Sequence, residues 1–114
     1  MSRHDDRVSL NDMLRHAREA MALLGGRSAD ELAQDRVGQL ALTRLVEVIG
    51  EAANRVSRQA QQRHAHVAWP QIIGMRNRLI DGYDVIDLDL LCDTVATDLP
   101  PLIEALEQIL EEEV

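Results

Sequence analysis

Arg76, Asn77, Asp81 and Tyr83 form the group of side chains in this sequence that is best suited to chemistry. They fall within residues 76–83, Arg-Asn-Arg-Leu-Ile-Asp-Gly-Tyr, a polar cluster set into an otherwise apolar helical segment. The planar guanidinium of arginine suits phosphate recognition, because its N–H groups bind two oxygens at once. Asp81 is a weak base with almost no acid form at pH 7, since the pKa of an ordinary aspartate is about 3.9. The cluster therefore combines a phosphate-binding group with a carboxylate that moves protons poorly.

The spacing of these residues limits how one helix could bring them together. Arg76 and Tyr83 are seven positions apart and fall on one stripe of a regular helix, whereas Arg76 and Asp81 are separated by about 140° around the axis. Asp81 instead neighbours Asn77. A site that joins Arg76 to Asp81 needs long side chains, a helix end near Gly82, or a second subunit.

Two long helices are predicted in the first half of the chain. Ser9 begins a Ser-x-x-acid pattern, and apolar residues then recur at helical intervals until the glycines at 25 and 26. The same capping pattern at Ser28 opens a second helix, which we expect to run without interruption to about Arg63. Gly38 and Gly50 lie inside it, although each glycine lowers helix stability by about 1 kcal/mol relative to alanine. Close packing against another helix would explain why glycine occurs there.

The second half predicts shorter helices. We expect a third helix to begin at Trp69 and Pro70, because proline suits the first turn of a helix. Gly82 is expected to end it. Asp87 caps a further segment, and Pro100 and Pro101 are expected to interrupt it before a last helix over 102–111.

These patterns predict an all-α fold, an up-and-down bundle of four to five helices in a single domain spanning 1–114. The chain has 46% hydrophobic residues but only Trp69 and Tyr83 as aromatics, which favours packed helices over a β-sandwich. The second helix carries more apolar side chains than one short bundle can cover. We therefore expect a homodimer.

Charge and composition exclude several classes of protein. The net charge of −8 argues against a large basic surface that binds nucleic acid, so any RNA contact is local. All 12 basic residues are arginines, which codon usage explains as well as phosphate binding does. The lone Cys92 fits a core position, and His64 and His66 lack partners at ligand spacing, so they are expected to be exposed and to bind no metal. No signal peptide or membrane-spanning run is present, which favours a cytoplasmic protein.

Four segments, in order along the chain, resemble the HepT-like toxins of the HEPN superfamily. They are Ile-Gly-Glu-Ala-Ala-Asn at 49–54, Trp-Pro-Gln-Ile-Ile-Gly-Met-Arg-Asn at 69–77, Gly-Tyr at 82–83 and Asp-Leu-Pro-Pro-Leu at 98–102. The family's motif has arginine, four residues, histidine, one residue and tyrosine. Here Asp81 holds the histidine position.

The resemblance implies a helical homodimer whose two motifs face each other across a cleft and cleave RNA without a metal or another cofactor. Arg76 and the histidine expected at position 81 would form the active pair, with Asn77 beside them. Such a site needs a group that moves protons near neutral pH and a cation that stabilises the phosphate. Asp81 replaces the first of these and could pair with Arg76, so we expect ribonuclease activity to be weak or lost.

The resemblance also implies a partner and a modification. An MNT-type nucleotidyltransferase antitoxin would transfer AMP from ATP to Tyr83 and so block RNA, although a core or interface ring explains a tyrosine here equally well. Glu51 and Asn54 either support the motif helix through hydrogen bonds or form an ordinary structural polar pair.

Several alternatives stay open at this stage. Two explanations of aspartate at position 81 remain: the chain is a natural family member that is kept for binding, or it is a variant of a toxic protein that was inactivated. The chain could be a non-catalytic HEPN module that partners a nucleotidyltransferase, which an adjacent nucleotidyltransferase gene would favour. A purely structural dimerisation protein would tolerate Arg76→Ala without functional loss.

Overall fold

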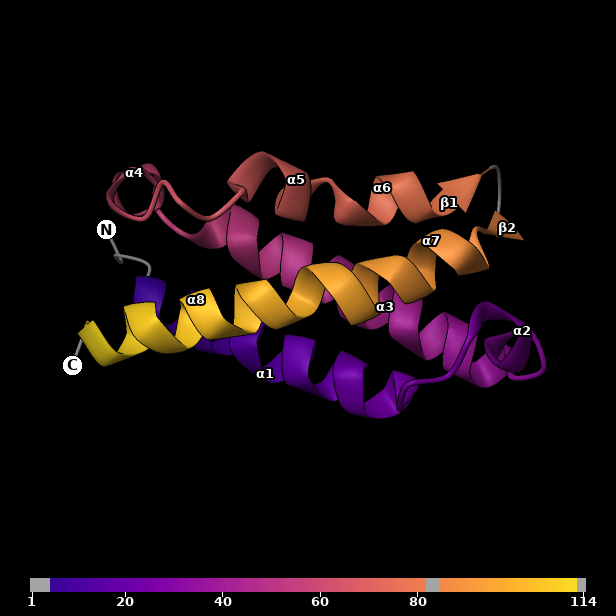
Figure 1. Cartoon of the computed structure of the whole chain (residues 1–114). Helices are drawn as coiled ribbons and strands as arrows, with labels where there is room; N and C mark the ends of the chain where they lie inside the picture. The colour runs from indigo at the N-terminus through magenta and orange to yellow at the C-terminus, as the bar shows by residue number, and fades with distance from the viewer. Residues whose placement is uncertain (1–4, 82–84, 113–114) are drawn as a thin grey trace.

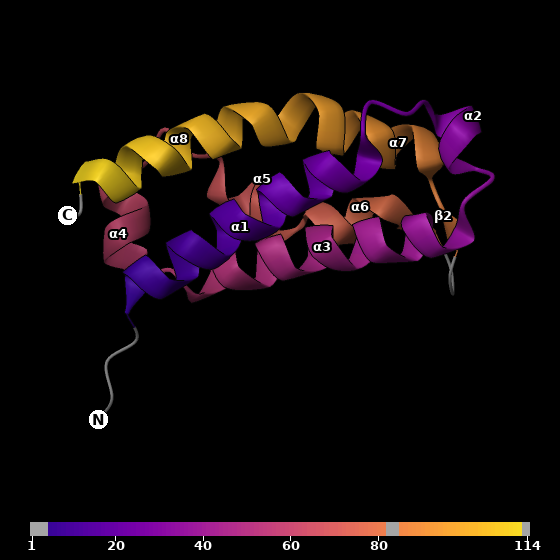
Figure 2. The same ribbon diagram turned by 90° about the horizontal axis from the view of Figure 1, so that it is seen from below.

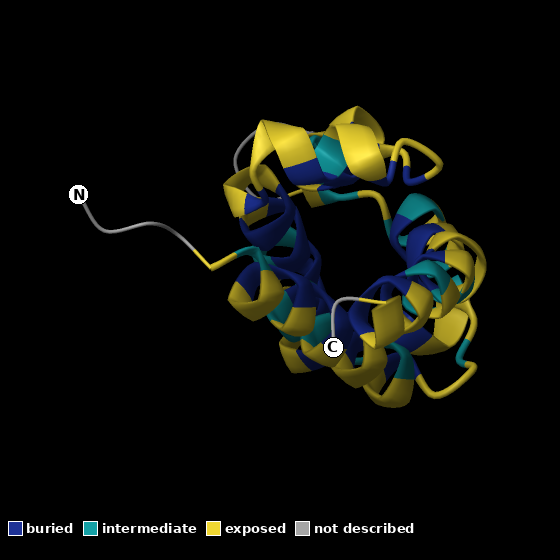
Figure 3. Cartoon of the chain, turned by 90° about the vertical axis from the view of Figure 1, so that its left-hand side faces the viewer, coloured by how far each residue is buried: buried dark blue, intermediate teal, exposed yellow. Residues whose placement is uncertain are grey.

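The chain folds into an elongated helical bundle of 44 × 26 × 22 Å, seen here in a computed structural model that describes residues 5–81 and 85–112. Four helical segments, which we call rods, run back and forth along the long axis: residues 6–24, the helix over 36–55, the two short helices over 69–79 and the last helical stretch over 88–112 (Figure 1). Buried segments face the centre of the bundle and exposed ones face outward when it is seen end-on (Figure 3). The predicted all-α bundle is confirmed.

The first rod is α1, Asp6–Leu24, and it begins earlier than predicted. Asp5 caps it by accepting a hydrogen bond from the backbone N–H of Arg7, so Ser9 is a buried residue inside the helix rather than its cap. The helix ends at Gly25, which adopts a left-handed conformation with φ of 60° that glycine tolerates without steric cost.

The predicted second helix is divided into three. It consists of α2 (Ala29–Leu32), α3 (Arg36–Arg55) and α4 (Arg58–Arg63). The capping box at Ser28 is confirmed, but Asp35 and Ser57 then cap new helices in the middle of the expected one. Their side chains accept hydrogen bonds from backbone N–H groups, which stabilises a helix start where the apolar pattern alone predicts continuity.

The third rod is likewise divided, at Gly74, into α5 (Trp69–Ile73) and α6 (Met75–Leu79). Pro70 lies in the first turn of α5, as predicted. The helix ends at Leu79, before Gly82, because the chain turns into a short strand β1 (Ile80–Asp81), which pairs antiparallel with β2 (Val85–Ile86). The sequence did not predict this two-stranded ladder.

The last rod is continuous rather than interrupted by the prolines. It comprises α7 (Leu88–Asp93), a π-helical turn η1 (Thr94–Asp98) and α8 (Leu99–Glu112), and Asp87 caps it as predicted. The π turn ends at Asp98, two residues before Pro100. Pro100 and Pro101 fall in the first turn of α8, where a missing N–H costs little.

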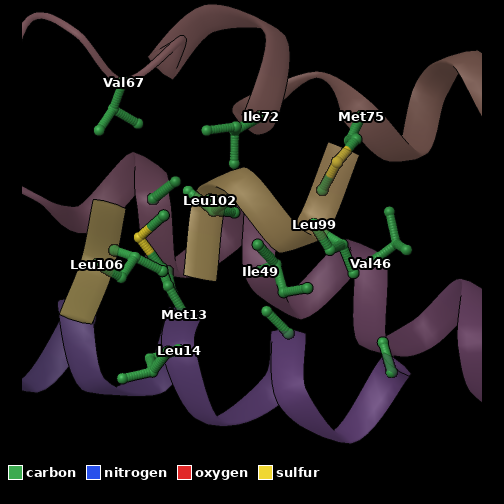
Figure 4. Close-up of a cluster of buried hydrophobic side chains, with 14 of the residues drawn as sticks. Met13, Leu14, Val46, Ile49, Val67, Ile72, Met75, Leu99, Leu102 and Leu106 are labelled. Atoms are coloured by element: carbon green, nitrogen blue, oxygen red, sulfur yellow. The ribbon is translucent and has the colours of Figure 1, made fainter. Parts of the chain in front are cut away.

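The rods meet around one apolar core. α1 packs against α3 and α8, and α3 also packs against α5 and α6 (Figures 1 and 2). Side chains from all four rods meet in the interior, as Figure 4 shows for Met13, Leu14, Val46, Ile49, Ile72, Met75, Leu99, Leu102 and Leu106. Within the described residues, no helix is both long and apolar enough to cross a membrane.

Glycine occurs at the two interior positions 38 and 50 of α3 for different reasons. A Cβ on Gly50 would lie 3.0 Å from the carbonyl oxygen of Ile73 and 3.1 Å from that of Ile72, so glycine here permits the close approach of α5, as predicted. The three atoms nearest to a Cβ on Gly38 would all belong to the capping carboxylate of Asp35, the closest at 2.3 Å, so the capping contact explains this glycine. Helix packing is therefore the wrong explanation for Gly38.

Candidate functional site

Arg76 and Asn77 lie on the solvent side of α6. Met75 and Leu79, four positions apart, are buried and anchor this short helix to the core, which leaves the three polar residues between them exposed. Arg76 is thus presented by a helix that packs on α3, and 44% of its side-chain surface is accessible.

The guanidinium of Arg76 is held by a carboxylate of α3. Its Nε lies 3.0 Å from Oε2 of Glu47, a side chain that is 29% exposed. Because the contact uses Nε, the terminal nitrogens of Arg76 keep their N–H groups free of hydrogen bonds to the described residues. Among the described residues, the arginine is therefore held at one edge only, and its other edge has the geometry to bind an anion.

Glu47 joins Arg76 to a second arginine. Its Oε1 accepts a hydrogen bond of 2.7 Å from Nη1 of Arg44, one turn earlier on α3. The same Nη1 lies 3.5 Å from Oε1 of Glu51. The hydrogen bond to Glu47 is the main cause that raises the pKa of Arg44 above its usual value, with Glu51 adding to it, so this arginine is charged at every physiological pH.

Neither of the two predicted supporting residues contacts the motif helix through a hydrogen bond among the described residues. Glu51 pairs with Arg44 on its own helix, and Asn54 is exposed and makes no hydrogen bond to α6 among the described residues. Glu47, which does contact the motif helix, was not identified from the sequence. Its one signal was its position four residues before Glu51, on the same stripe of α3.

The remaining motif residues are only partly described. The backbone of Asp81 lies in β1, opposite Val85, but its side chain lies outside the described part of the structure. Tyr83 and Gly82 also lie outside it. Because α6 ends at Leu79, the separation of 140° that a straight helix imposes between positions 76 and 81 does not apply.

Arg76 and Asn77 are exposed to solvent on the surface of α6. A pocket of about 440 Å³ lies between α5 and α8. Its polar lining consists of the side chains of His66, Gln71, Arg78, Thr97 and Asp98. Arg76 and Asn77 do not line it.

The histidines and the cysteine differ in their surroundings. His66 is exposed as predicted, but His64 is buried, and its carbonyl oxygen accepts a hydrogen bond from Nε1 of Trp69. In the part of the chain that the structure describes, no three His, Cys, Asp or Glu side chains are grouped to hold a metal ion. Cys92 packs beside the core, and its burial raises the pKa of the thiol.

Comparison with known families decides what kind of protein this geometry belongs to. Residues 13–109 match the family Ribonuclease HepT-like, which covers α3, α6 and the charged cluster between them. The chain belongs to the HepT-like ribonuclease family. This confirms the resemblance to HepT-like proteins of the HEPN superfamily.

Two relatives of this HepT-like chain match almost its whole length, and a third matches part of it. A protein of Caldanaerobacter subterraneus subsp. tengcongensis named "Putative RNase TTE0752" is 28% identical over 94% of this chain and 96% of its own. One of Methanocaldococcus jannaschii named "Putative RNase MJ1380" is 29% identical over 94% and 98%. The "Probable ribonuclease HepT" of Thermococcus cleftensis is 34% identical over 60% of this chain and 62% of its own. No solved structure matches the chain.

Proposed function

We propose that this HepT-like chain, as one HEPN-like domain over residues 1–114, is the ribonuclease toxin of a cytoplasmic toxin-antitoxin pair. Its substrate is RNA, and two copies form the cleft in which the RNA binds. The observation that carries this proposal is the position of Arg76, fixed through Nε by Glu47 with its terminal nitrogens turned to no other described residue. Membership of a ribonuclease family supplies the reaction class.

The reaction needs no metal ion. The ribose 2′-oxygen attacks the neighbouring phosphorus, the bond to the 5′-oxygen breaks, and a 2′,3′-cyclic phosphate and a 5′-hydroxyl result. A base takes the proton of the 2′-hydroxyl and an acid gives one to the leaving 5′-oxygen. Arg76 stabilises the added negative charge on the phosphate in the transition state, and Asn77 beside it donates a hydrogen bond to the substrate.

Asp81 makes this chain a weak or inactive ribonuclease. A histidine at position 81 would hold and release a proton near pH 7, whereas a carboxylate with a pKa of about 3.9 has almost no acid form there. Its negative charge also opposes the phosphate. Without a group that moves protons near neutral pH, Arg76 can still bind a phosphate, so the site as it stands is better suited to holding a ligand than to cleaving it.

The exposed apolar residues support a dimer near the motif. Among the described residues, four of the five large apolar side chains exposed to solvent belong to the end of α1, the start of α3 and β2: Leu23, Val37, Leu40 and Val85. These elements lie at the same end of the bundle (Figures 1 and 2). A second copy that covers this end would bring its own motif close to the first.

The partner we propose is an MNT-type nucleotidyltransferase antitoxin. Transfer of AMP from ATP to the hydroxyl of Tyr83 forms a phosphodiester and releases pyrophosphate, and the added bulk and charge exclude RNA. The presence of Asp81 at the position of the motif histidine favours a second candidate, a non-catalytic HEPN module that binds this partner. A mass increase of one AMP on Tyr83, after incubation with the antitoxin and ATP, tests the modification in either case.

RNA cleavage at neutral pH with EDTA present tests the ribonuclease proposal. We expect purified wild-type protein to be inactive or slow and Asp81→His to cleave RNA. Arg76→Ala added to Asp81→His is expected to abolish that cleavage, which excludes a contaminating nuclease. An inactive Asp81→His protein that is correctly folded would overturn the proposal and favour the binding module.

A further inference from the structure

Arg44 belongs to the same charged cluster as Arg76, although it lies on a different element and outside the motif. One carboxylate, that of Glu47, contacts Nη1 of Arg44 through Oε1 and Nε of Arg76 through Oε2. The two guanidinium groups are therefore neighbours on one surface, held in position by the same residue.

The exposed fractions of the side chains show that an anion meets the two arginines before it meets Glu47. The side chain of Arg44 is 62% exposed and that of Arg76 is 44% exposed, whereas the shared Glu47 is 29% exposed. The carboxylate thus lies deeper than the cations it holds. A negatively charged ligand that approaches this surface meets guanidinium N–H groups before it meets Glu47.

The remaining contact of Arg44 is easily exchanged. Glu51 is 56% exposed and lies at 3.5 Å from Arg44 Nη1, the outer limit of a hydrogen bond. Exposed ion pairs of this kind contribute little to stability, whereas a phosphate binds a guanidinium through two parallel hydrogen bonds. A phosphate can therefore displace Glu51 without disturbing the pairing through Glu47.

We propose that Arg44 is a second phosphate-binding residue of this site, which contacts a phosphate next to the one held by Arg76 on the same RNA strand. The inference rests on the proposed function. Its ligand is the sugar-phosphate backbone of single-stranded RNA, so the contact strengthens binding without selecting bases. Glu47 acts as the positioning residue that keeps the two guanidinium groups side by side.

The chain offers a closely matched control. Arg15 on α1 is also an exposed arginine, 72% accessible, and it also pairs with a carboxylate three positions away, Asp12. Arg44→Ala and Arg15→Ala remove the same charge and the same kind of surface ion pair. Only the first removes a partner of Glu47. Arg44→Lys keeps the charge but loses the bidentate geometry.

The first experiment measures binding of a fluorescein-labelled oligouridylate to the wild-type chain and these variants at several salt concentrations. We expect Arg44→Ala to weaken binding several-fold and to lower the salt slope by about 0.7, the value for one lost phosphate contact on a single strand. Arg44→Lys should keep the slope and lose part of the affinity. Arg15→Ala should match the wild type.

A second measurement separates phosphate binding from a structural role. In the Asp81→His background, Arg44→Ala is expected to raise KM several-fold with kcat nearly unchanged, whereas a residue that only supports Arg76 would lower kcat. Equal binding by Arg44→Ala and Arg15→Ala, or a fall in kcat alone, would overturn the inference while leaving the ribonuclease proposal intact. If the wild-type chain and Asp81→His both fail to bind or cleave RNA, both proposals are wrong.

Discussion

Glu47 controls the charge of the candidate site at the scale of single residues. Arg44 and Arg76 contribute two positive charges, and Glu47 and Glu51 cancel both. The cluster is therefore organised but electrically neutral before a ligand binds. This neutrality fits a chain whose net charge of −8 gives RNA no long-range attraction.

Glu47→Gln should separate binding from catalysis. Removal of the carboxylate leaves the arginine pair with a net positive charge, so we expect RNA affinity to rise by up to about fivefold, the factor that corresponds to 1 kcal/mol. In the Asp81→His background, kcat should fall because Arg76 loses the partner that positions it. Binding and single-turnover cleavage assays measure the two effects.

The exposed Glu19 of α1 provides the control for this change. Glu19→Gln alters the net charge by the same amount at a residue that pairs with neither Arg44 nor Arg76, and we expect neither quantity to change. Equal gains in affinity for Glu19→Gln and Glu47→Gln would mean that overall charge, and not the site, governs binding.

The sequence identified Arg76 but not its partner, for a reason that applies to most sites of this kind. A motif shows residues that are close along the chain, whereas Glu47 reaches Arg76 only because α6 packs on α3. Glu51 was chosen from its place in a family-like segment, but its side chain contacts Arg44 on its own helix. Periodicity gives the face of a helix and does not give the neighbour across it.

At the scale of helices and turns, the apolar pattern predicted which segments are helical but not where they break. The predicted helix over 28–63 contains three, because Asp35 and Ser57 cap new starts. Conversely, Pro100 and Pro101 were expected to break a helix that is continuous, because a π turn precedes them. Capping and bulging depend on single side-chain contacts that an average over a window does not detect.

Gly50→Ala should destabilise the fold even though alanine favours helices. An alanine in an ordinary helix interior gains about 1 kcal/mol over glycine. Here its Cβ would lie 3.0 and 3.1 Å from two backbone carbonyl oxygens of α5, which cannot rotate away as a side chain does. Urea unfolding should show a lower midpoint for Gly50→Ala and a still lower one for Gly50→Val. A more stable alanine variant would contradict the close packing.

Asp35 links the end of α1 to the start of α3 and makes the stability of the fold depend on pH. Its carboxylate caps α3 at Gly38 and pairs at 2.9 Å with Arg27, whose Nε and Nη2 donate to the last carbonyls of α1. The hydrogen bond from Arg27, followed by that from Gly38, lowers the pKa of Asp35 below its usual 3.8. The folded state therefore favours the ionised carboxylate.

Asp35→Asn should reveal this contribution as a function of pH. Asparagine can still cap α3, but it cannot pair with Arg27 through a charge. Because the folded pKa is lower than the unfolded one, the stabilisation is fully present above about pH 4 and is lost as the pH falls through the folded pKa. The difference in urea midpoint between wild type and Asp35→Asn should be clear at pH 7 and shrink towards pH 3. A gap that grows with acid would contradict this assignment.

At the scale of the whole molecule, the sequence predicted the bundle correctly because helical periodicity is strong along all four rods. It also predicted that the long second helix carries more apolar surface than one chain covers. Val37 is 77% exposed and Leu40 48% exposed, whereas Leu42, Val46 and Ile49 of the same helix are buried. The position of this surface, at the same end of the bundle as β2 and the end of α6, could be recognised only after the helices were placed together (Figure 1).

Val37→Asp tests whether that surface joins two copies. We expect the wild-type chain to sediment as a dimer and Val37→Asp to sediment as a monomer, because a charge in an apolar interface loses its water without gaining a partner. Val37 is so exposed within one chain that the variant should fold normally. Val8→Asp, at an apolar residue of α1 that is 52% exposed, changes the charge equally and should stay dimeric.

The same pair of variants connects assembly to activity. In the Asp81→His background, a site shared between two subunits requires that Val37→Asp lose RNA cleavage in parallel with the dimer, while Val8→Asp keeps it. Raising the protein concentration should restore both association and cleavage if the interface is weakened and not abolished. Full activity in a monomeric Val37→Asp protein would mean that each copy of Arg76 acts without a second subunit, and the composite cleft would be wrong.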